Sequence, residues 1–223
     1  MAEKTNKIDP KNPKKLFVEG NDDLHVIGNI WKHTMKQEIP PFYIKDCKGI
    51  DNVPTDLEAI LQNPAATEIL GIVIDADFEL NNHWQSVKNQ LVKAGYVLPE
   101  EPAQNGTIVE KQGKYPRLGI WLMPNNQTTG MLEDFVTYLV PENDKLWPES
   151  ERVLAEIENQ GLHLYNKKTE RSKALVHTWL AWQKNPGKPM GIAIQANFLT
   201  THHELCQCFV TWLDNLFNTT TTK

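Results

Sequence analysis

Acidic side chains follow several apolar segments of this chain, at the points where those segments stop. Glu19 follows KLFV, Asp75 and Asp77 close EILGIVIDAD, and Glu133 lies shortly after RLGIWLMP. Apolar runs without alternation are typical of parallel strands that are covered on both faces. Functional groups of such sheets collect beyond the carboxyl ends of the strands. We therefore expect these carboxylates to lie together at one edge of a sheet.

Carboxylates that lie this close together predict a bound cation. Side chains at alternate positions of a strand share a face, so Asp75 and Asp77 are expected to project together. Neighbouring carboxylates raise one another's pKa unless a cation lies between them. Mg²⁺ prefers a few carboxylate oxygens completed by water. The pattern predicts a Mg²⁺ or Mn²⁺ site, which suits phosphoryl chemistry.

Each acidic residue also has a structural interpretation. Glu19 and Gly20 could form a plain turn, Asp75 and Asp77 could cap the next helix, and Glu133 could favour the dipole of its own helix. Their joint placement at successive strand ends favours the metal site over these separate explanations.

The order of apolar segments predicts strands that alternate with helices and then a helical end. The fold class expected is α/β, with a mostly parallel, Rossmannoid sheet flanked by helices and a helical C-terminal extension. The expected strands are 15–20, 41–49, 68–77 and 117–124, with a small hairpin within 97–116. The expected helices begin at 22 and 130 and cover 54–61, 82–94, 149–160, 168–184 and 202–217.

We expect one compact unit in three parts. Residues 1–14 are polar and lysine-rich and are predicted to be a disordered tail, 15–125 the α/β core, and 126–223 a helical extension packed on that core. In the last helix, Thr201 and Glu204 have the spacing of a capping box.

Composition narrows the class of protein. The net charge is −5, which argues against a wholesale nucleic-acid coat but leaves room for a local basic patch. No apolar run is long enough for a membrane span, and the N-terminal segment lacks a signal peptide's apolar stretch, so we expect a cytoplasmic protein without membrane contact. The motifs GxxxxGK[ST], GxGxxG and GxSxG are absent from the sequence.

The acidic segments together resemble a known superfamily. A strand that ends in VEG before Asp-Asp and a helix, followed by a strand that ends in Asp-Ala-Asp, resembles the Toprim domain of topoisomerases, DnaG-type primases, OLD-family nucleases and small ribosomal-RNA maturases. That resemblance covers residues 15–125. FVEGNDD, GIVIDAD, GMLEDFV and HELCQCFVTWLDNLF are most similar to a small, mostly prokaryotic Toprim-like family of uncharacterised function near the OLD-type nucleases.

The resemblance implies roles for particular residues. Glu19 would be the general acid or base or a metal ligand, and Asp75 and Asp77 would hold the divalent metal. OLD-like nucleases add an acid, which Glu133 matches, and a lysine, for which Lys173 is the candidate. The alternative interpretation of Lys173, a solvated lysine on a helix, is the more common one for a residue of this type.

The chain also departs from the superfamily. Topoisomerases carry a third acid where this chain has the longer Glu79, and no tyrosine, helicase or ATPase domain accompanies the Toprim-like part, so topoisomerase activity is not expected. The function expected is Mg²⁺-dependent phosphodiester hydrolysis of DNA or RNA. The alternative is a non-catalytic module that binds metal, a nucleotide or nucleic acid within a larger complex. Nucleotidyl transfer is a third alternative, and the oligomeric state, a homodimer included, is left open.

Basic residues near the expected site are candidates for phosphate contacts. Lys167, Lys168 and Arg171 precede or accompany Lys173 in one short segment. Such clusters contact phosphates in nucleic-acid-binding proteins, although many are simply solvated helix faces.

Overall fold

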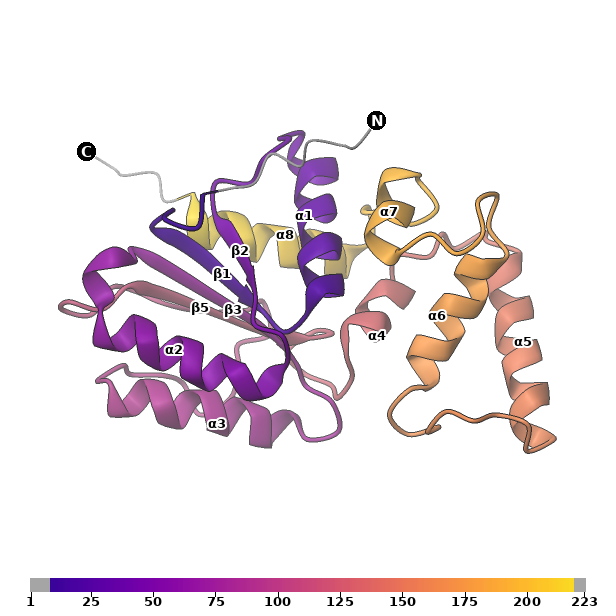
Figure 1. Cartoon of the computed structure of the whole chain (residues 1–223), viewed down its shortest axis with the longest axis horizontal. Helices are drawn as coiled ribbons and strands as arrows, with labels where there is room; N and C mark the ends of the chain where they lie inside the picture. The colour runs from indigo at the N-terminus through magenta and orange to yellow at the C-terminus, as the bar shows by residue number, and fades with distance from the viewer. Residues whose placement is uncertain (1–8, 219–223) are drawn as a thin grey trace.

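A five-stranded, mostly parallel sheet forms the centre of the fold (Figure 1). The computed structural model describes residues 9–218. The strand order is β2-β1-β3-β5-β4, with β4 antiparallel to β5 and the other neighbours parallel. The strands are β1 (Lys14–Val18), β2 (Tyr43–Asp46), β3 (Ile69–Asp75), β4 (Thr107–Val109) and β5 (Arg117–Met123). The predicted α/β class and its helical C-terminal part are confirmed.

Eight α-helices flank or extend the sheet within the described residues. They are α1 (Asn21–Met35), α2 (Val53–Gln62), α3 (Leu80–Lys93), α4 (Leu132–Thr137), α5 (Leu146–Asn159), α6 (Arg171–Ala181), α7 (Met190–Gln195) and α8 (Glu204–Phe217). Short 3₁₀ turns, η1 (Ile50–Asn52) and η2 (Pro64–Ala66), flank α2. The sequence did not predict α7, whose six residues are too short to show a helical period.

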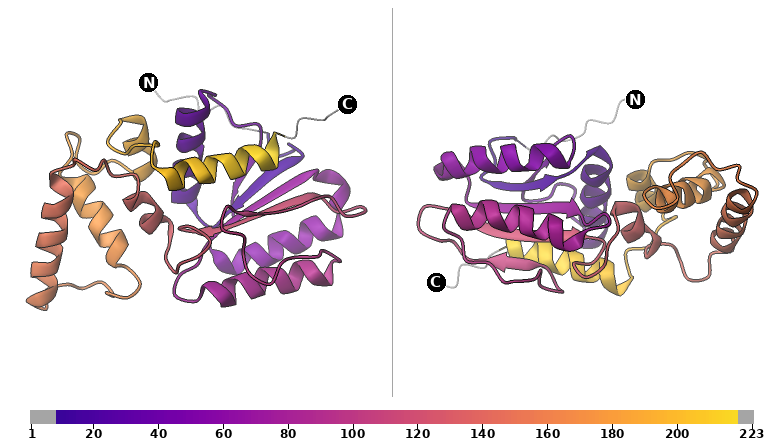
Figure 2. Two further views of the ribbon diagram at one scale, coloured as in Figure 1. Left: turned by 180° about the vertical axis from the view of Figure 1, so that it is seen from behind. Right: turned by 90° about the horizontal axis from the view of Figure 1, so that it is seen from below.

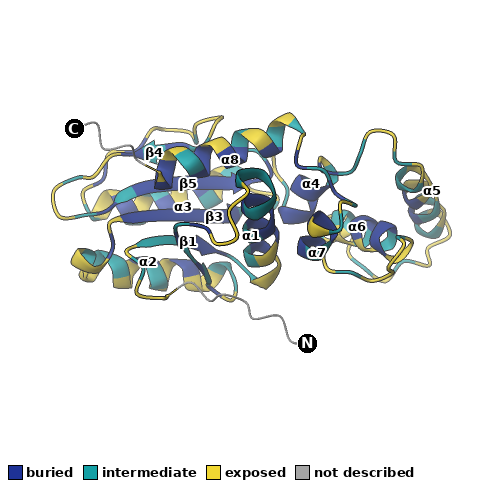
Figure 3. Cartoon of the chain, turned by 90° about the horizontal axis from the view of Figure 1, so that it is seen from above, coloured by how far each residue is buried: buried dark blue, intermediate teal, exposed yellow. Residues whose placement is uncertain are grey.

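Each central strand sends alternate side chains into two separate cores. Leu16 and Val18 of β1 belong to the core beneath α1 and α8, whereas Phe17 belongs to the core beneath α2 and α3. Figure 2 shows α2 and α3 on one face and α8 on the other. Figure 3 shows that β3 and β5 are buried along most of their length. Burial on both faces explains the uninterrupted apolar runs of β3 and β5.

Two glycines let α8 approach the sheet closely. Gly71 of β3 and Gly119 of β5 are register partners. A Cβ added at Gly119 would lie 2.4 Å from Leu216 Cδ2 of α8, and one at Gly71 would lie 2.6 Å from Leu16 Cδ1. Larger side chains at this pair would therefore push α8 away from the strands.

Basic side chains from the sheet hold the C-terminal end of α8. Arg117 Nη1 donates to the carbonyl oxygens of Asn215 and Leu216 at 2.7 and 2.9 Å, and Lys14 Nζ donates to the Phe217 carbonyl at 2.7 Å. These cations satisfy carbonyls that have no partner within the helix and complement its dipole. The beginnings of β1 and β5 are thereby tied to the end of α8.

The capping box predicted for α8 is wrong. The helix begins at Glu204, and the residue before it, His203, caps it, because His203 Nδ1 accepts from the Leu205 amide at 3.1 Å. Thr201 is buried, and its Oγ1 lies 3.2 Å from His33 Nδ1 of α1. The sequence has the spacing of a capping box, but the Thr201 hydroxyl contacts His33 instead of capping the helix.

Helices α5 and α6, with the segment that joins them, form an arm that projects from the sheet. Helices α5 and α6 pack against each other, with Trp147 and Trp179 in edge contact, and extend beyond α4 (Figure 1). Helix α7 packs on α1. No helix among residues 9–218 is long and apolar enough to cross a membrane. Of the predicted disordered tail, residues 1–8 lie outside the described residues.

Replacing Gly119 by alanine is expected to destabilise the fold by about 1–3 kcal/mol, because overpacking a filled core forces side chains and backbone to shift. Leu216, which the new methyl group would meet, is fully buried. Urea unfolding of wild type and Gly119→Ala would measure the difference.

Gly28→Ala is the matched control, since Gly28 lies inside α1 and a Cβ there meets Ile44 Cδ1 at an ordinary 3.8 Å. This variant should be as stable as wild type or more stable by up to about 1 kcal/mol, the helix-propensity gain. Equal stability of Gly119→Ala and wild type would contradict the close approach of α8.

Candidate active site

The first strands of the sheet bring Glu19 and Asp75 to the same edge. Val18 and Val73 are register partners in the parallel pair β1 and β3, so both strands end side by side. Glu19 Oε2 accepts from the Asp75 amide at 3.3 Å. The two carboxylates therefore lie across adjacent strand ends, as the sequence predicted.

Asp77 reaches this edge in a different way from the one predicted. Strand β3 ends at Asp75, and Asp77 has a left-handed φ of 46°. The prediction that the two aspartates share a face of one strand is therefore wrong. Asp77 forms an antiparallel bridge with Gly130, with amide-to-carbonyl distances of 2.8 and 2.7 Å in the two directions. Its Oδ2 lies 3.6 Å from His83 Nε2.

Helix α4 brings Glu133 to the same place. Asp75 Oδ1 accepts from the Leu132 amide at 2.9 Å, so the end of β3 is joined directly to the first turn of α4. Glu133, the next residue, is buried, and its Oε1 lies 3.7 Å from Lys173 Nζ of α6. Lys173 itself is exposed. The structure thus places Lys173 beside the acidic cluster.

Asp23 belongs to the cluster, although sequence reasoning did not select it. Its side chain is buried, Oδ2 accepts from the Gly20 amide at 3.1 Å, and the buried Oδ1 has no hydrogen-bond partner among the described residues. The signal was the helical period, since Asp23 shares the buried face of α1 with Val26, Ile27 and Ile30. Asp22, its neighbour, is exposed. We name Glu19, Asp23, Asp75, Asp77 and Glu133 the acidic cluster.

The acidic cluster is strained electrostatically. Burial raises the pKa of Asp75 well above its ordinary value, and the nearby charges of Asp23, Glu19, Glu133 and Asp77 raise it further. Burial, then the charge of Glu19, raises the pKa of Asp23 to about 7. Burial also raises the pKa of Glu19, although the hydrogen bond from the Asp75 amide opposes this. These carboxyl groups are therefore easier to protonate than ordinary ones, and a nearby cation would oppose that effect.

The side chains fit a divalent cation in chemistry, although they are not arranged as a closed site. Within residues 9–218, no group of three or more acidic, histidine or cysteine side chains is already arranged around a point where a metal would lie. One oxygen of each of Glu19, Asp23 and Asp75 is held by a backbone amide. The other oxygens accept no hydrogen bond from the described residues, and the buried Asp23 Oδ1 most needs a partner.

Asp134 caps the start of α4 and makes a second contact between α4 and the arm. Asp134 Oδ2 accepts from the Met131 amide at 2.8 Å, and Asp134 Oδ1 accepts from the Ser172 hydroxyl. Adjacent residues of α4, Glu133 and Asp134, thus contact adjacent residues of α6, Lys173 and Ser172. This double contact sets the position of α6 relative to the acidic cluster.

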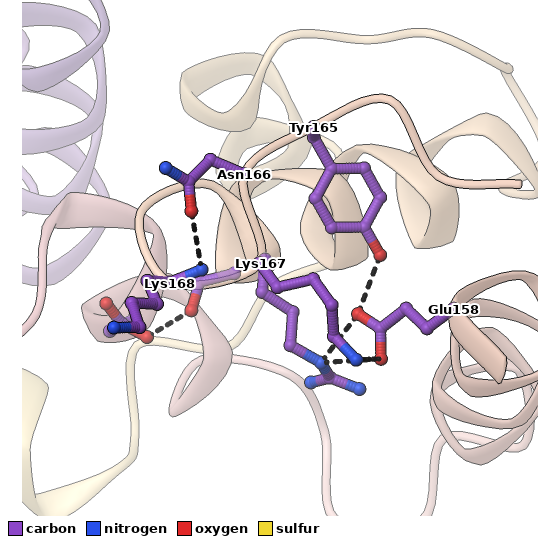
Figure 4. A network of polar contacts seen from close by, with 8 residues as sticks. Glu158, Tyr165, Asn166, Lys167 and Lys168 are labelled. Atoms are coloured by element: carbon purple, nitrogen blue, oxygen red, sulfur yellow. Dashed lines mark hydrogen bonds and ion pairs between the residues drawn. The ribbon is translucent and has the colours of Figure 1, made fainter. Parts of the chain in front are cut away.

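The basic segment before α6 is ordered around one glutamate (Figure 4). Glu158 of α5 accepts from the Tyr165 hydroxyl at 2.7 Å and pairs with Arg171 at 3.0 Å and with Lys167 at 3.4 Å. Lys168 makes no ion pair among the described residues, and its backbone amide donates to Asn166 Oδ1 at 3.0 Å. Lys168 is therefore the basic side chain of this segment whose charge is uncompensated.

Two cavities border the site. The smaller, of about 260 Å³, lies between the core and the arm and is lined by both acidic and basic residues, among them Asp77, Asp134, Lys167, Lys168 and Arg171. The larger, of about 660 Å³, lies along the beginning of α3. A ligand at the smaller cavity would touch the acidic cluster at Asp77.

Comparison with known proteins gave one match. The model of a family described as "Protein of unknown function (DUF3226)" matches residues 13–218, nearly all of the chain. No curated protein and no solved structure matched.

The raised pKa values predict a stability that falls with pH when no metal is present. Glu19, Asp23 and Asp75 bind protons more tightly in the folded than in the unfolded state, so the folded state binds more protons above an ordinary carboxyl pKa. Stability should decline from about pH 4 to about pH 7, the range between the ordinary and raised pKa of Asp23. Urea unfolding in EDTA across this range would measure it.

Asp75→Asn should flatten this decline and be more stable than wild type at pH 7, because it removes a buried charge and keeps an acceptor for the Leu132 amide. Asp22→Asn, at the exposed neighbour of Asp23, should follow the wild-type profile. Parallel profiles for wild type and Asp75→Asn would show that the acidic cluster is not under repulsion.

Proposed function

Because the chain belongs to the DUF3226 family, whose description assigns no activity, we propose a function from the site itself. The proposal is Toprim-type, metal-dependent hydrolysis of phosphodiester bonds in nucleic acid. The acidic cluster would hold Mg²⁺ or Mn²⁺, and the nearby basic segment would contact the phosphates of the substrate.

The observation that carries this proposal is the burial of several carboxylates without matching cations. Burial, and then the charges of four neighbouring acidic groups, raise the pKa of Asp75. A purely structural role would favour pairing them with basic residues or replacing them, since unpaired buried charges cost stability. A site for a divalent cation explains why the charges are kept.

Each residue has a chemical task in this proposal. A bound Mg²⁺ would orient the phosphate and neutralise charge in the transition state. Glu19 has one oxygen that accepts no hydrogen bond from the described residues, so it would position or deprotonate the attacking water. Lys173, held beside Glu133, would stabilise negative charge on the phosphorane.

The basic segment supports a nucleic-acid substrate. Lys168 and Arg171 line the same cavity as Asp77, so cations and the acidic cluster face one ligand position. A phosphodiester backbone that enters this cavity would meet a metal on one wall and basic side chains on the other. The net charge of −5 is compatible with this, because the positive charge required is local.

A non-catalytic binding module is the alternative, and one observation favours it. Glu19, Asp23 and Asp75 each commit an oxygen to a backbone amide, which is also how structural carboxylates hold turns and helix starts. Such a module would bind a metal, a nucleotide or nucleic acid and cleave nothing. Metal binding and cleavage must therefore be measured separately.

Asp75→Asn is expected to lose Mg²⁺ binding and to abolish cleavage while remaining folded, because it removes a central ligand and relieves repulsion. Isothermal titration of Mg²⁺ and Mn²⁺, run beside cleavage assays on single- and double-stranded DNA and RNA, would measure both effects. Asp22→Asn is the matched control and should retain wild-type binding and cleavage. Metal-dependent cleavage by Asp75→Asn would sink the assignment, whereas wild-type metal binding without cleavage would favour the module.

Lys173→Met should separate charge stabilisation from metal binding. The variant keeps the length of the side chain and removes its charge, so Mg²⁺ affinity should change little. The cleavage rate should fall by about 10²- to 10³-fold, the effect of losing one group that stabilises transition-state charge. An unchanged rate in single-turnover assays would make Lys173 a solvated lysine.

A further inference from the structure

An exposed aromatic ring lies directly beside the acidic cluster. Phe78 follows Asp77 in the loop between β3 and α3 and is 48% exposed. The left-handed conformation of Asp77 turns the chain immediately before this residue. Folding does not bury this ring, although the other phenylalanines of the described residues are buried or partly buried.

Phe78 lies at the boundary between the two cavities. It lines both of them, and Thr129, from the segment that leads into α4, is the other residue common to both. Figure 1 shows that the β3–α3 loop lies at the edge of the sheet from which the arm projects. A ligand that occupied both cavities would therefore pass across the ring and Asp77 together.

The larger cavity has the size for a planar group, and its lining combines uncharged side chains with two carboxylates, Glu79 and Glu101. Its volume of about 660 Å³ falls within the roughly 300–1,000 Å³ range of small-molecule sites. Asn81 and Gln127 line it and are exposed, and their side-chain amides make no hydrogen bond to the described residues. Side-chain amides of this kind hydrogen-bond to the edges of nucleobases, and aromatic rings stack on their faces.

The smaller cavity has basic and hydroxyl groups that suit a phosphate, opposite the carboxylates Asp77 and Asp134. Lys168, which has no ion-pair partner among residues 9–218, lines it together with Arg171 and the hydroxyl-bearing Thr169. The first turn of α6 also borders it at Ser172, and helix N-termini favour anions. The two cavities thus match the two parts of a nucleotide, since the larger suits a base and the smaller a phosphate.

We infer that the site takes an unpaired nucleotide, whose base stacks on Phe78 in the larger cavity while its phosphate enters the smaller one. The inference rests on the proposed function and makes its substrate single-stranded or locally unpaired nucleic acid. A paired base within a duplex presents no free face to the ring. A free nucleotide has the same chemistry, so the test includes both sources.

The test measures the affinity of labelled oligonucleotides by fluorescence anisotropy, with Ca²⁺ in place of Mg²⁺ so that the readout does not depend on cleavage. Single-stranded DNA and RNA should bind more tightly than the duplex of the same sequence. Phe78→Ala should raise the Kd for the single strand by about 5- to 150-fold, the range that base–aromatic stacking shows on alanine substitution. Phe78→Trp should retain binding.

An abasic oligonucleotide of equal length separates the two cavities, because it keeps the phosphates and lacks the bases. Phe78→Ala should not change its affinity, whereas Lys168→Ala should weaken both the abasic and the normal strand and reduce the salt dependence of binding. Val97→Ala, which removes another exposed apolar side chain away from both cavities, should leave every affinity unchanged.

An equal effect of Phe78→Ala and Val97→Ala on the single strand would overturn the inference, as would an equal effect of Phe78→Ala on normal and abasic strands. Binding through Phe78 without metal-dependent cleavage would keep the inference and refute the proposed hydrolysis. If Phe78→Ala changed neither the Kd nor the cleavage rate, the proposed hydrolysis would stand and the inference about Phe78 would be refuted. Binding of a mononucleotide but of no strand, dependent on Phe78, would identify the free nucleotide as the ligand.

Discussion

Repulsion between carboxylates at one edge of the sheet is the constraint on which the site depends. Parallel strands β1 and β3 end side by side, so Glu19 and Asp75 cannot avoid each other, and α1 and α4 add Asp23 and Glu133. Hydrogen bonds from the backbone amides of Gly20, Asp75 and Leu132 stabilise part of this negative charge. The remainder is left for protons or a cation, which links the stability of the fold to the chemistry of the site.

Helices α1 and α4 start in the same way on either side of that edge. In each, an aspartate in the first turn accepts from the amide just before the helix, Asp23 from Gly20 and Asp134 from Met131. Both helix N-termini therefore point towards the acidic cluster, where their dipoles favour negative charge. The second start also carries the link to the arm, since Asp134 accepts from Ser172.

The sequence predicted those parts whose signal is local and strong. Uninterrupted apolar runs identified β3 and β5, and the acids at the ends of β1 and β3 identified Glu19 and Asp75 as neighbours. The position of Asp77 was predicted wrongly because the alternation of a strand was extended beyond Asp75, where the strand ends. Nothing in the sequence marks Asp77 as the residue with a left-handed backbone conformation. Asp23 was missed although it lies on the helical period of the buried face of α1, because an aspartate in the first turn of a helix is readily explained by the helix dipole. Thr201 lost its expected cap to a contact with His33, far away in sequence.

The seating of α8 over the glycine pair of β3 and β5 has a consequence for how the protein is made. The strands are synthesised long before α8, the last helix of the described residues, yet α8 covers much of one apolar face. During synthesis on the ribosome, this apolar face of the sheet stays exposed to solvent until α8 emerges. Exposed apolar surface of this kind promotes aggregation and binding by chaperones. The core is thus completed only after α8 has been synthesised and packs on the sheet. Lys14 and Arg117, which donate to carbonyls at the end of α8, then hold the helix in place.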